Sequence, residues 1–214
     1  MSWRTSNWGE PPIHIDEYLT NEEVGEQYPG ENIYYDGILI KGLRERIASS
    51  KKNKVLIVLH TSTCHGPKYA NKYPKEFEVF KPVARNVEEG EKNVAMLVNA
   101  YDNTIRYTDY LLDSLISMLQ GMKEWKSAMV FVSDHGESLG ENKIFMHGLP
   151  MKLAPKVQYE IPFLVWTSEG FRNYKDNLPA VIDQHYVFHS VLNLLSIQSP
   201  AYNKDFDLFS TVPR

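Results

Sequence analysis

The stretch "AMVFVSDHGESLGENKIFMHGLP", residues 128–150, carries the strongest fold signal and the strongest chemical signal of the chain. Its first six residues form a short, mostly apolar run of the length of one buried β-strand. The run ends in Asp134, His135 and Gly136, and a second histidine, His147, follows in a loop-like segment. We therefore expect a carboxylate and an imidazole where a buried strand ends.

Further strand-like segments alternate with helical patterns along the chain. Strands are predicted at 54–60 ("KVLIVLH") and 161–167 ("IPFLVWT") in addition to 128–133. Helices are predicted from an N-cap at Asp36 to about residue 50, over 93–122 with a stop at Gly121, and over 184–195. This alternation predicts an α/β fold with right-handed crossovers and a mostly parallel sheet covered by helices on both faces.

The helix at 93–122 is the strongest of these patterns. Its apolar residues recur at helical spacing and predict one stripe that faces the core. The stripe consists of Val94, Leu97, Val98, Tyr101, Ile105, Thr108, Leu111, Leu112, Leu115, Ile116 and Leu119.

The chain of 214 residues is 43% hydrophobic, which is enough for one substantial core, and we predict a single domain over 1–214. Its formal net charge of −4 argues against a nucleic-acid partner. No apolar run approaches the roughly 18 residues of a membrane span, and the start does not read as a signal peptide. The opening "MSWRTSNWGEPP" reads instead like the middle of a domain, so we expect a piece of a longer protein.

Asp134 and His135 are candidate ligands of a metal ion. In sheets of this kind ligands collect at the carboxyl ends of the strands, where both residues are expected, and His65 follows the end of the strand at 54–60. Adjacent side chains on an extended strand point to opposite faces, so both reach one ion only if the chain turns, and Gly136 permits that turn. A carboxylate and an imidazole suit Zn²⁺, with Mn²⁺ as an alternative.

Other interpretations of the histidines stay open at this point. The Asp134–His135 pair is also typical of a helix cap with a surface histidine. His65 and His147 can supply a second imidazole set for a metal or a phosphate, or have no such role. His60 is expected to pack at its strand end, and His14, His185 and His189 at the surface or in helix packing.

Several other catalytic patterns do not fit. The sequence has no GxGxxG and no P-loop motif, which argues against nucleotide-cofactor chemistry, and no GxSxG elbow of an α/β-hydrolase. Cys64 is the single cysteine, so no disulfide forms within the chain, and this lack of a disulfide by itself weakly favours a reducing compartment. Cys64 beside His65 permits a thiol nucleophile, but sequence neighbours on a loop rarely have the required geometry.

Longer motifs carry a family resemblance. "SDHGESLGEN", "HGLP", "KLAPK" and "LHTSTCHGPKYANKYPKEF" together resemble the phosphoethanolamine transferases of the alkaline phosphatase/sulfatase superfamily. The resemblance is to the EptA, EptC and mobile colistin-resistance types, and most to the EptC type. It extends over most of the chain, including "NAYDNTIRYTDYLL", "IPFLVWTS" and "YNKDFDLF". It implies a three-layer α/β/α fold and the carboxyl-terminal portion of a sulfatase-like catalytic domain.

The resemblance also implies a role for each matching residue. Asp134 and His135 match the ligands of the catalytic zinc. His65 and His147 match histidines on the phosphate side of the site, which act in catalysis and substrate binding and can hold a second zinc. Asn7 matches a polar residue that contacts substrate, although Pro11 stands near the place of the lysine that follows it in the family. Glu137 is expected to orient the zinc ligands, or to be an exposed loop acid.

The activity implied is zinc-dependent, ping-pong transfer of phosphoethanolamine from phosphatidylethanolamine to lipid A or lipooligosaccharide, which gives resistance to cationic peptides such as polymyxin. It takes place at the periplasmic face of the bacterial inner membrane, in a multi-pass membrane protein. In the family a glutamate zinc ligand, the threonine nucleophile and the membrane region precede the segment that matches Trp3 to Pro11. We therefore expect this chain to lack them and to be inactive alone. The disulfides usual in the family are absent as well.

Two alternatives to a phosphoethanolamine transferase stay open. A sulfatase, phosphodiesterase or phosphoglycerol transferase of the same superfamily would have another nucleophile. A binding module with the same fold would have lost the metal and the chemistry.

Overall fold

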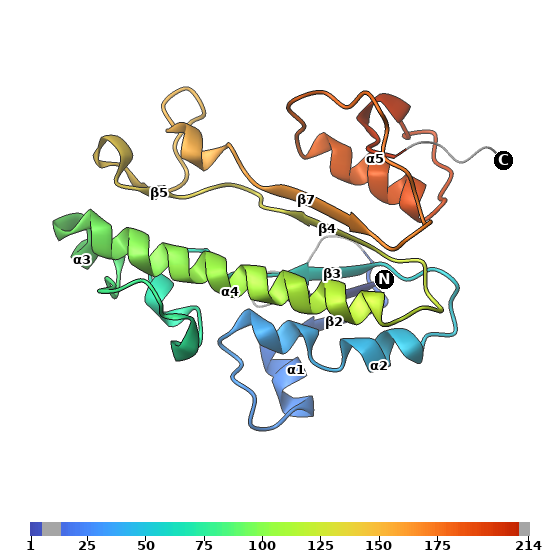
Figure 1. The fold of residues 1–214 in the computed structure, drawn as a ribbon, viewed down its shortest axis with the longest axis horizontal. Coiled ribbons are helices and arrows are strands. Elements are labelled where there is room, and N and C mark those ends of the chain that lie inside the picture. Colours follow the sequence, from blue (N-terminus) through green and yellow to red (C-terminus); the bar gives the residue numbers. More distant parts are fainter. Residues whose placement is uncertain (6–13, 210–214) are drawn as a thin grey trace. The chain divides into compact units, whose positions relative to one another are not determined.

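The computed structural model describes residues 1–5 and 14–209. The chain divides into two compact units, whose elements are labelled in Figure 1 where there is room. The first comprises Met1–Leu115 and Glu137–Gln158, and the second comprises Ile116–Gly136 and Tyr159–Arg214. No helix among the described residues combines the length and the apolar character that crossing a bilayer requires.

A three-stranded parallel sheet organises the first unit. Its order is β2-β1-β3, with β1 Ser2–Thr5 between β2 Glu17–Thr20 and β3 Ile57–His60. In the register, Trp3 lies opposite Tyr18 on one side and Val58 on the other. The sheet confirms the strand predicted at 54–60 and its parallel pairing. Thr5, Thr20 and His60 therefore mark one carboxyl edge of the sheet.

The first unit also contains several helices and short 3-10 turns. Their bounds are α1 Asn21–Gln27, η1 Asp36–Ile40, α2 Leu43–Ala48, η2 Tyr69–Asn71, η3 Lys75–Phe77, α3 Val87–Lys92, η4 Glu141–Lys143 and η5 Lys156–Gln158. A small antiparallel hairpin, β5 Ser138–Leu139 with β6 Phe145–Met146, belongs to the same unit. Val24 of α1 packs with Ile38 and Leu39 of η1 into a cluster that also contacts Leu59 of β3.

The helix predicted from Asp36 to about residue 50 is in fact two elements. Gly42 has a left-handed backbone (φ +60°), which ends η1 and starts α2. A β-carbon there would lie 1.6 Å from the hydroxyl of Tyr28, so the break requires glycine. Asp36 is not an N-cap either: its buried carboxylate makes long-range hydrogen bonds described below.

Helix α4, Val94–Gln120, confirms the helix predicted at 93–122. Its buried face differs in part from the predicted stripe, because Asn103 and Thr104 are fully buried whereas Val94 and Ile105 are exposed. The Asn103 amide oxygen accepts the backbone N–H groups of Val79 and Phe80, and its nitrogen donates to the Phe80 carbonyl. The Asn103 amide can be buried because its polar atoms are hydrogen-bonded. A search for apolar residues at helical spacing does not detect such a residue.

The second unit pairs β4 Ala128–Val132 with β7 Phe163–Thr167. Both strands were predicted, but their pairing is antiparallel, with Val130 opposite Val165, so they do not join each other by a right-handed parallel crossover. Helix α5, His185–Leu194, lies where a helix was predicted, and η6 Lys204–Phe206 follows it. The hydrophobic core of the second unit contains Tyr186, Leu208 and Phe209. The parallel sheet with helices nevertheless confirms the α/β class, while the single-domain prediction stays a prediction.

Candidate functional site

His65 lies in a tight turn after the carboxyl end of β3. The backbone N–H of His65 donates to the carbonyl of Ser62 across 3.1 Å, which closes the turn 62–65. At the start of this turn the Asp36 carboxylate accepts the backbone N–H groups of Ser62 and Thr63 at 2.8 and 2.7 Å. The turn is therefore held in place from outside by a buried acid.

Glu137 fixes the other side of the same turn. Its side chain is almost completely buried, and Oε1 accepts the backbone N–H of Gly66, the residue after His65, at 3.2 Å. Its Oε2 lies 3.1 Å from Nδ1 of His147. The angle of this second contact is not that of a hydrogen bond, so it is an electrostatic contact between neighbours. One carboxylate thus touches both segments that carry a candidate histidine.

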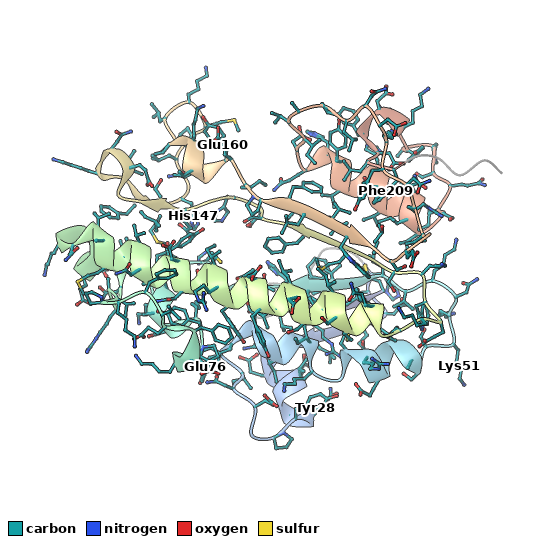
Figure 2. The ribbon with its side chains drawn as sticks, viewed as in Figure 1. Tyr28, Lys51, Glu76, His147, Glu160 and Phe209 are labelled. Carbon is teal, nitrogen blue, oxygen red and sulfur yellow. The ribbon has the colours of Figure 1, made fainter. Side chains whose placement is uncertain are left out.

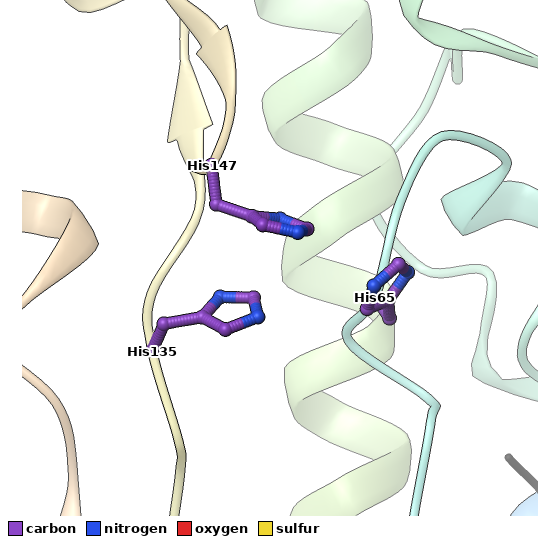
Figure 3. A group of neighbouring side chains, drawn as sticks. All are labelled: His65, His135 and His147. Atoms are coloured by element: carbon purple, nitrogen blue, oxygen red, sulfur yellow. The ribbon is translucent and has the colours of Figure 1, made fainter. Parts of the chain in front are cut away.

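The rings of His65 and His147 lie edge to face with centroids 5.1 Å apart (Figure 3). His147 leaves the end of β6 (Figure 2), between Met146 at φ +65° and Gly148 at φ +100°. Gln158 braces this bend, because its side-chain nitrogen donates to the Met146 carbonyl and to the Ser138 hydroxyl. The structure therefore brings together His65, His147 and Glu137 within the first unit.

Asp134 and His135 follow β4 in the second unit. The side-chain nitrogen of Gln184 donates to the carbonyls of Ser133 and Asp134 at 2.8 and 3.0 Å, and the Ser133 hydroxyl donates to the His135 carbonyl. These bonds hold the chain in a bend after the strand. The Asp134 carboxylate is exposed, with Oδ2 3.8 Å from Nε2 of His135, so after the bend both side chains of the pair are close enough to face one ion.

The chain itself limits how far His135 can lie from Glu137. Only Gly136 separates it from Glu137, and two residues span at most about 7 Å even when fully extended. Among the described residues, the imidazoles of His65, His135 and His147 and the Asp134 carboxylate are donor types that zinc accepts.

His65, His135 and His147 are each followed by glycine, and the carbonyl of this glycine orients the rings of His65 and His135. Nδ1 of His65 lies 2.7 Å from the Gly66 carbonyl, and Nδ1 of His135 lies 3.0 Å from the Gly136 carbonyl. A carbonyl at Nδ1 keeps the proton on that nitrogen and leaves the Nε2 lone pair available. Glu137 beside Nδ1 of His147 favours the same tautomer. Imidazoles with Nδ1 held by an oxygen are the usual zinc ligands, so these residues fit a zinc ion.

Two tyrosines near the site were not predicted to have a role. Burial, reinforced by the charge of Glu137, raises the pKa of the Tyr69 hydroxyl far above its usual range. Burial likewise raises the pKa of Tyr101, whose ring packs edge to face on that of Tyr69. Both therefore remain neutral near Glu137 and add no charge. Tyr69 lies four residues after His65 in "HGPKY", and this closeness in sequence could have indicated a place near the site.

Cys64 does not have the properties of a nucleophile. Burial raises the pKa of its thiol, and its sulfur lies 3.4 Å from the hydroxyls of Thr104 and Thr108. A nucleophilic cysteine requires a lowered pKa, so the thiol alternative is not supported.

The remaining histidines lie as predicted, at a strand end, on the surface or in helix packing. Nδ1 of His60 is 3.2 Å from the Thr5 hydroxyl at the sheet edge. His14 is exposed, and His185 contacts Asp183 on the surface. His189 accepts the backbone N–H of Asn203 in helix packing. Asn7 lies outside the described residues, as does Pro11.

Comparison with known proteins identifies the family. The profile of the sulfatase family matches residues 6–197. The chain belongs to the sulfatase family. The Helicobacter pylori protein named phosphoethanolamine transferase EptA is 41% identical over 213 residues, which cover 96% of this chain and 41% of that protein. The chain therefore spans about two fifths of the length of this relative.

Solved structures of this sulfatase family have the same fold. The soluble domain of lipooligosaccharide phosphoethanolamine transferase A from Neisseria meningitidis is 30% identical with a TM-score of 0.84, and the match covers 100% of this chain and 67% of that one. The periplasmic domain of phosphoethanolamine transferase EptC from Campylobacter jejuni is 28% identical with a TM-score of 0.77, covering 97% and 66%. The sulfatase-like fold expected from the resemblance is confirmed.

Proposed function

We propose that this protein transfers phosphoethanolamine from phosphatidylethanolamine to lipid A or lipooligosaccharide, at the periplasmic face of the bacterial inner membrane. Relatives named as phosphoethanolamine transferases support the reaction, and the name of one of them specifies lipooligosaccharide. The observation that carries the proposal is Glu137, a buried carboxylate that contacts both the His65 turn and His147. Such an arrangement orients imidazoles toward a metal and a phosphate.

Each site residue has an assigned part in this proposal. Asp134 and His135 bind the catalytic Zn²⁺, and His65 and His147 bind the phosphate or a second zinc. Asn7 contacts the substrate. When bound, zinc would neutralise charge on the phosphoryl oxygens and lower the pKa of a hydroxyl nucleophile. The charge of Glu137 beside Nδ1 of His147 favours the proton on that nitrogen and leaves the Nε2 lone pair for the metal or the phosphate.

The transfer proceeds in two displacements. In the first displacement the threonine reacts as its alkoxide: its oxygen bonds to phosphorus, the bond to the diacylglycerol oxygen breaks, and an imidazolium of His65 or His147 gives that oxygen its proton. In the second displacement the resulting neutral imidazole takes the proton of the acceptor, a sugar hydroxyl or a singly protonated lipid A phosphate. The acceptor oxygen then bonds to phosphorus, and the bond from phosphorus to the threonine oxygen breaks, which regenerates the alkoxide. The ethanolamine amine then offsets negative charge on the cell surface and weakens the binding of polymyxin.

The experiment is a transfer assay with a fluorescent phosphatidylethanolamine analogue and added zinc. The whole protein should release diacylglycerol and form a phosphoethanolamine adduct on a threonine. Residues 1–214 alone should not turn over, because none of their threonines matches the family nucleophile. Robust transfer by residues 1–214 would contradict the assignment of the nucleophile.

Asp134→Asn in the whole protein should abolish transfer and lower the zinc content, because the amide is a weaker ligand than the carboxylate. Asp176→Asn, at an exposed acid of the same unit, is the matched control. Normal activity in the Asp134 variant would exclude the assigned role.

The match to the sulfatase family favours another enzyme of the same superfamily as the second candidate. That enzyme would be a sulfatase, a phosphodiesterase or a phosphoglycerol transferase. Incubation with a sulfate ester and a glycerophosphate donor distinguishes these reactions, and turnover of either in preference to phosphatidylethanolamine would favour them. A metal-free binding module would contain no zinc after mild purification.

A further inference from the structure

Asp36 lies far from His65 in the sequence but is bonded to the turn that carries it. The Asp36 side chain is buried, with 3% of the residue exposed, and a single oxygen, Oδ2, receives its bonds from this turn. Those donors are the backbone N–H groups of Ser62 and Thr63, and the hydroxyl of Thr63. A charged acceptor with three short donors is a strong and directional attachment.

The element that carries Asp36 is itself fixed. Ile38 and Leu39, two and three residues later in η1, are 2% and 0% exposed in the core. The backbone N–H of Gly37 donates to the Tyr107 hydroxyl of α4 at 3.0 Å. Asp36 therefore belongs to an element that is hydrogen-bonded to α4. Through the Asp36 carboxylate, the turn 62–65 is connected to the same helix.

Two buried carboxylates thus bracket His65. Asp36 holds the two residues at the start of the turn, and Glu137 holds Gly66, directly after His65. The intervening N–H of His65 bonds back to Ser62, so the turn has little freedom between its two attachments. Ring placement at such a site must be accurate to about half an ångström for metal or phosphate binding.

We propose that Asp36 is a positioning residue, which sets the place of the His65 imidazole through the turn 62–65. The proposal rests on the proposed function, in which His65 binds zinc or phosphate. Asp36 does not touch either ligand. Its contribution is to keep Nε2 of His65 at a fixed distance from His147.

The first test measures the turn without any metal. Amide hydrogen exchange of Asp36→Asn should show faster exchange at Ser62, Thr63 and His65, with unchanged protection in α5. Thr63→Val, which keeps both backbone bonds to Asp36, should show a smaller effect, and Thr63→Ser should restore normal exchange. Unchanged protection of the turn in Asp36→Asn would overturn the proposal.

The second test measures zinc binding by calorimetry in a double-mutant cycle. Asp36→Asn should weaken zinc binding roughly tenfold, as is usual when a group that orients a ligand is removed. In the His65→Ala background the same substitution should have no further effect, because the residue it positions is gone. An equal loss in both backgrounds would show a general structural role and overturn the proposal.

Asp207→Asn is the matched control. Asp207 is also a fully buried carboxylate with several donors, namely Asn193, Tyr202 and the Phe209 backbone, all in the second unit. Its substitution should lower the free energy of unfolding without a coupling to His65.

Absence of zinc binding by the unaltered protein would count against the proposed function rather than against Asp36. A crystal structure of Asp36→Asn then decides the positioning role. A His65 ring in its original place relative to His147 would overturn it, and a shifted ring would support it.

Discussion

Glu137 shows how one residue can organise a site without reacting. Its carboxylate accepts the Gly66 N–H with one oxygen and lies 3.1 Å from Nδ1 of His147 with the other. A β-carbon on Gly66 would lie 2.4 Å from the Met146 sulfur, so a side chain there would have to displace Met146. The close approach of these segments therefore depends on a glycine, a buried acid and two imidazoles together.

Glu137→Gln is expected to weaken zinc binding by about tenfold. The amide oxygen can still accept the Gly66 N–H, but the charge that holds the proton on Nδ1 of His147 is lost. Competition with a chromogenic chelator measures the affinity. Glu124→Gln, at an exposed acid, serves as control. Equal affinities for the Glu137 and Glu124 variants would show that Glu137 does not orient a ligand.

At the scale of elements, α4 supports the site through polar as well as apolar contacts. Tyr107 is 4% exposed and holds η1 through the Gly37 N–H, while Asn103 holds the backbone of the segment before α3. Leu97 and Ala100 pack with Tyr69 near the His65 turn. The helix thus fixes three surrounding segments of the first unit.

Burial raises the pKa of Tyr107 to about 12. Because this value lies above the ordinary value of 10, the folded state keeps the proton longer than the unfolded state. Its contribution to stability is complete below pH 10 and is lost as the pH rises towards 12. Urea unfolding at pH 9, 10 and 11 should show a decline of up to about 1.4 kcal/mol per pH unit for each such proton.

In the Tyr107→Phe variant the free energy of unfolding should fall less steeply with rising pH, because one titrating group is removed. The control is Tyr34→Phe, at a tyrosine that is 75% exposed. Identical slopes in the Tyr107 variant and the unaltered protein would contradict the assignment.

Thr20 caps α1 with a capping box. Its hydroxyl accepts the Glu23 N–H at 3.2 Å, and the Glu23 carboxylate accepts the Thr20 N–H at 2.8 Å. Thr20→Ala is expected to lower the free energy of unfolding by about 1 kcal/mol. Thr20→Ser should retain most of the stability in the same urea titration. A full loss in the serine variant would assign the effect to the threonine methyl group instead.

At the scale of the whole molecule, the candidate metal ligands come from segments far apart in the chain. His65 follows β3 and His147 follows β6 in the first unit, where their ring centroids lie 5.1 Å apart, and His135 follows β4 in the second unit. An unfolded chain does not hold the imidazoles of His65 and His147 together, so a metal that binds both binds mainly the folded state.

Zinc is therefore expected to stabilise the folded chain. At a free zinc concentration 100 times the Kd, the free energy of unfolding should rise by about 2.7 kcal/mol, and chelation should reverse the gain. Thermal unfolding with zinc and then with excess chelator measures this. His135→Ala should abolish most of the gain, whereas His185→Ala, at an exposed histidine, should not. A similar gain in both variants would indicate non-specific zinc binding.

The sequence predicted the elements better than their pairing. The strands at 54–60, 128–133 and 161–167 and the helix at 93–122 all lie close to the observed elements, because hydrophobic periodicity is a local property. The antiparallel pairing of β4 and β7 was not predicted, since an apolar strand reads the same in either orientation. The break at Gly42 was missed because it depends on contact with Tyr28.

The sequence by itself determined the α/β class, the family, and which residue types stand where strands end: Asp134, His135, and the three His-Gly pairs. Only the tertiary structure decided how the histidines are held. It placed Glu137 against Gly66 and His147, and Asp36 against Ser62 and Thr63. Glu137 and Gly66 are 71 positions apart. A buried carboxylate selects its partners by three-dimensional proximity, because burial requires that it be paired, and local sequence does not encode that pairing.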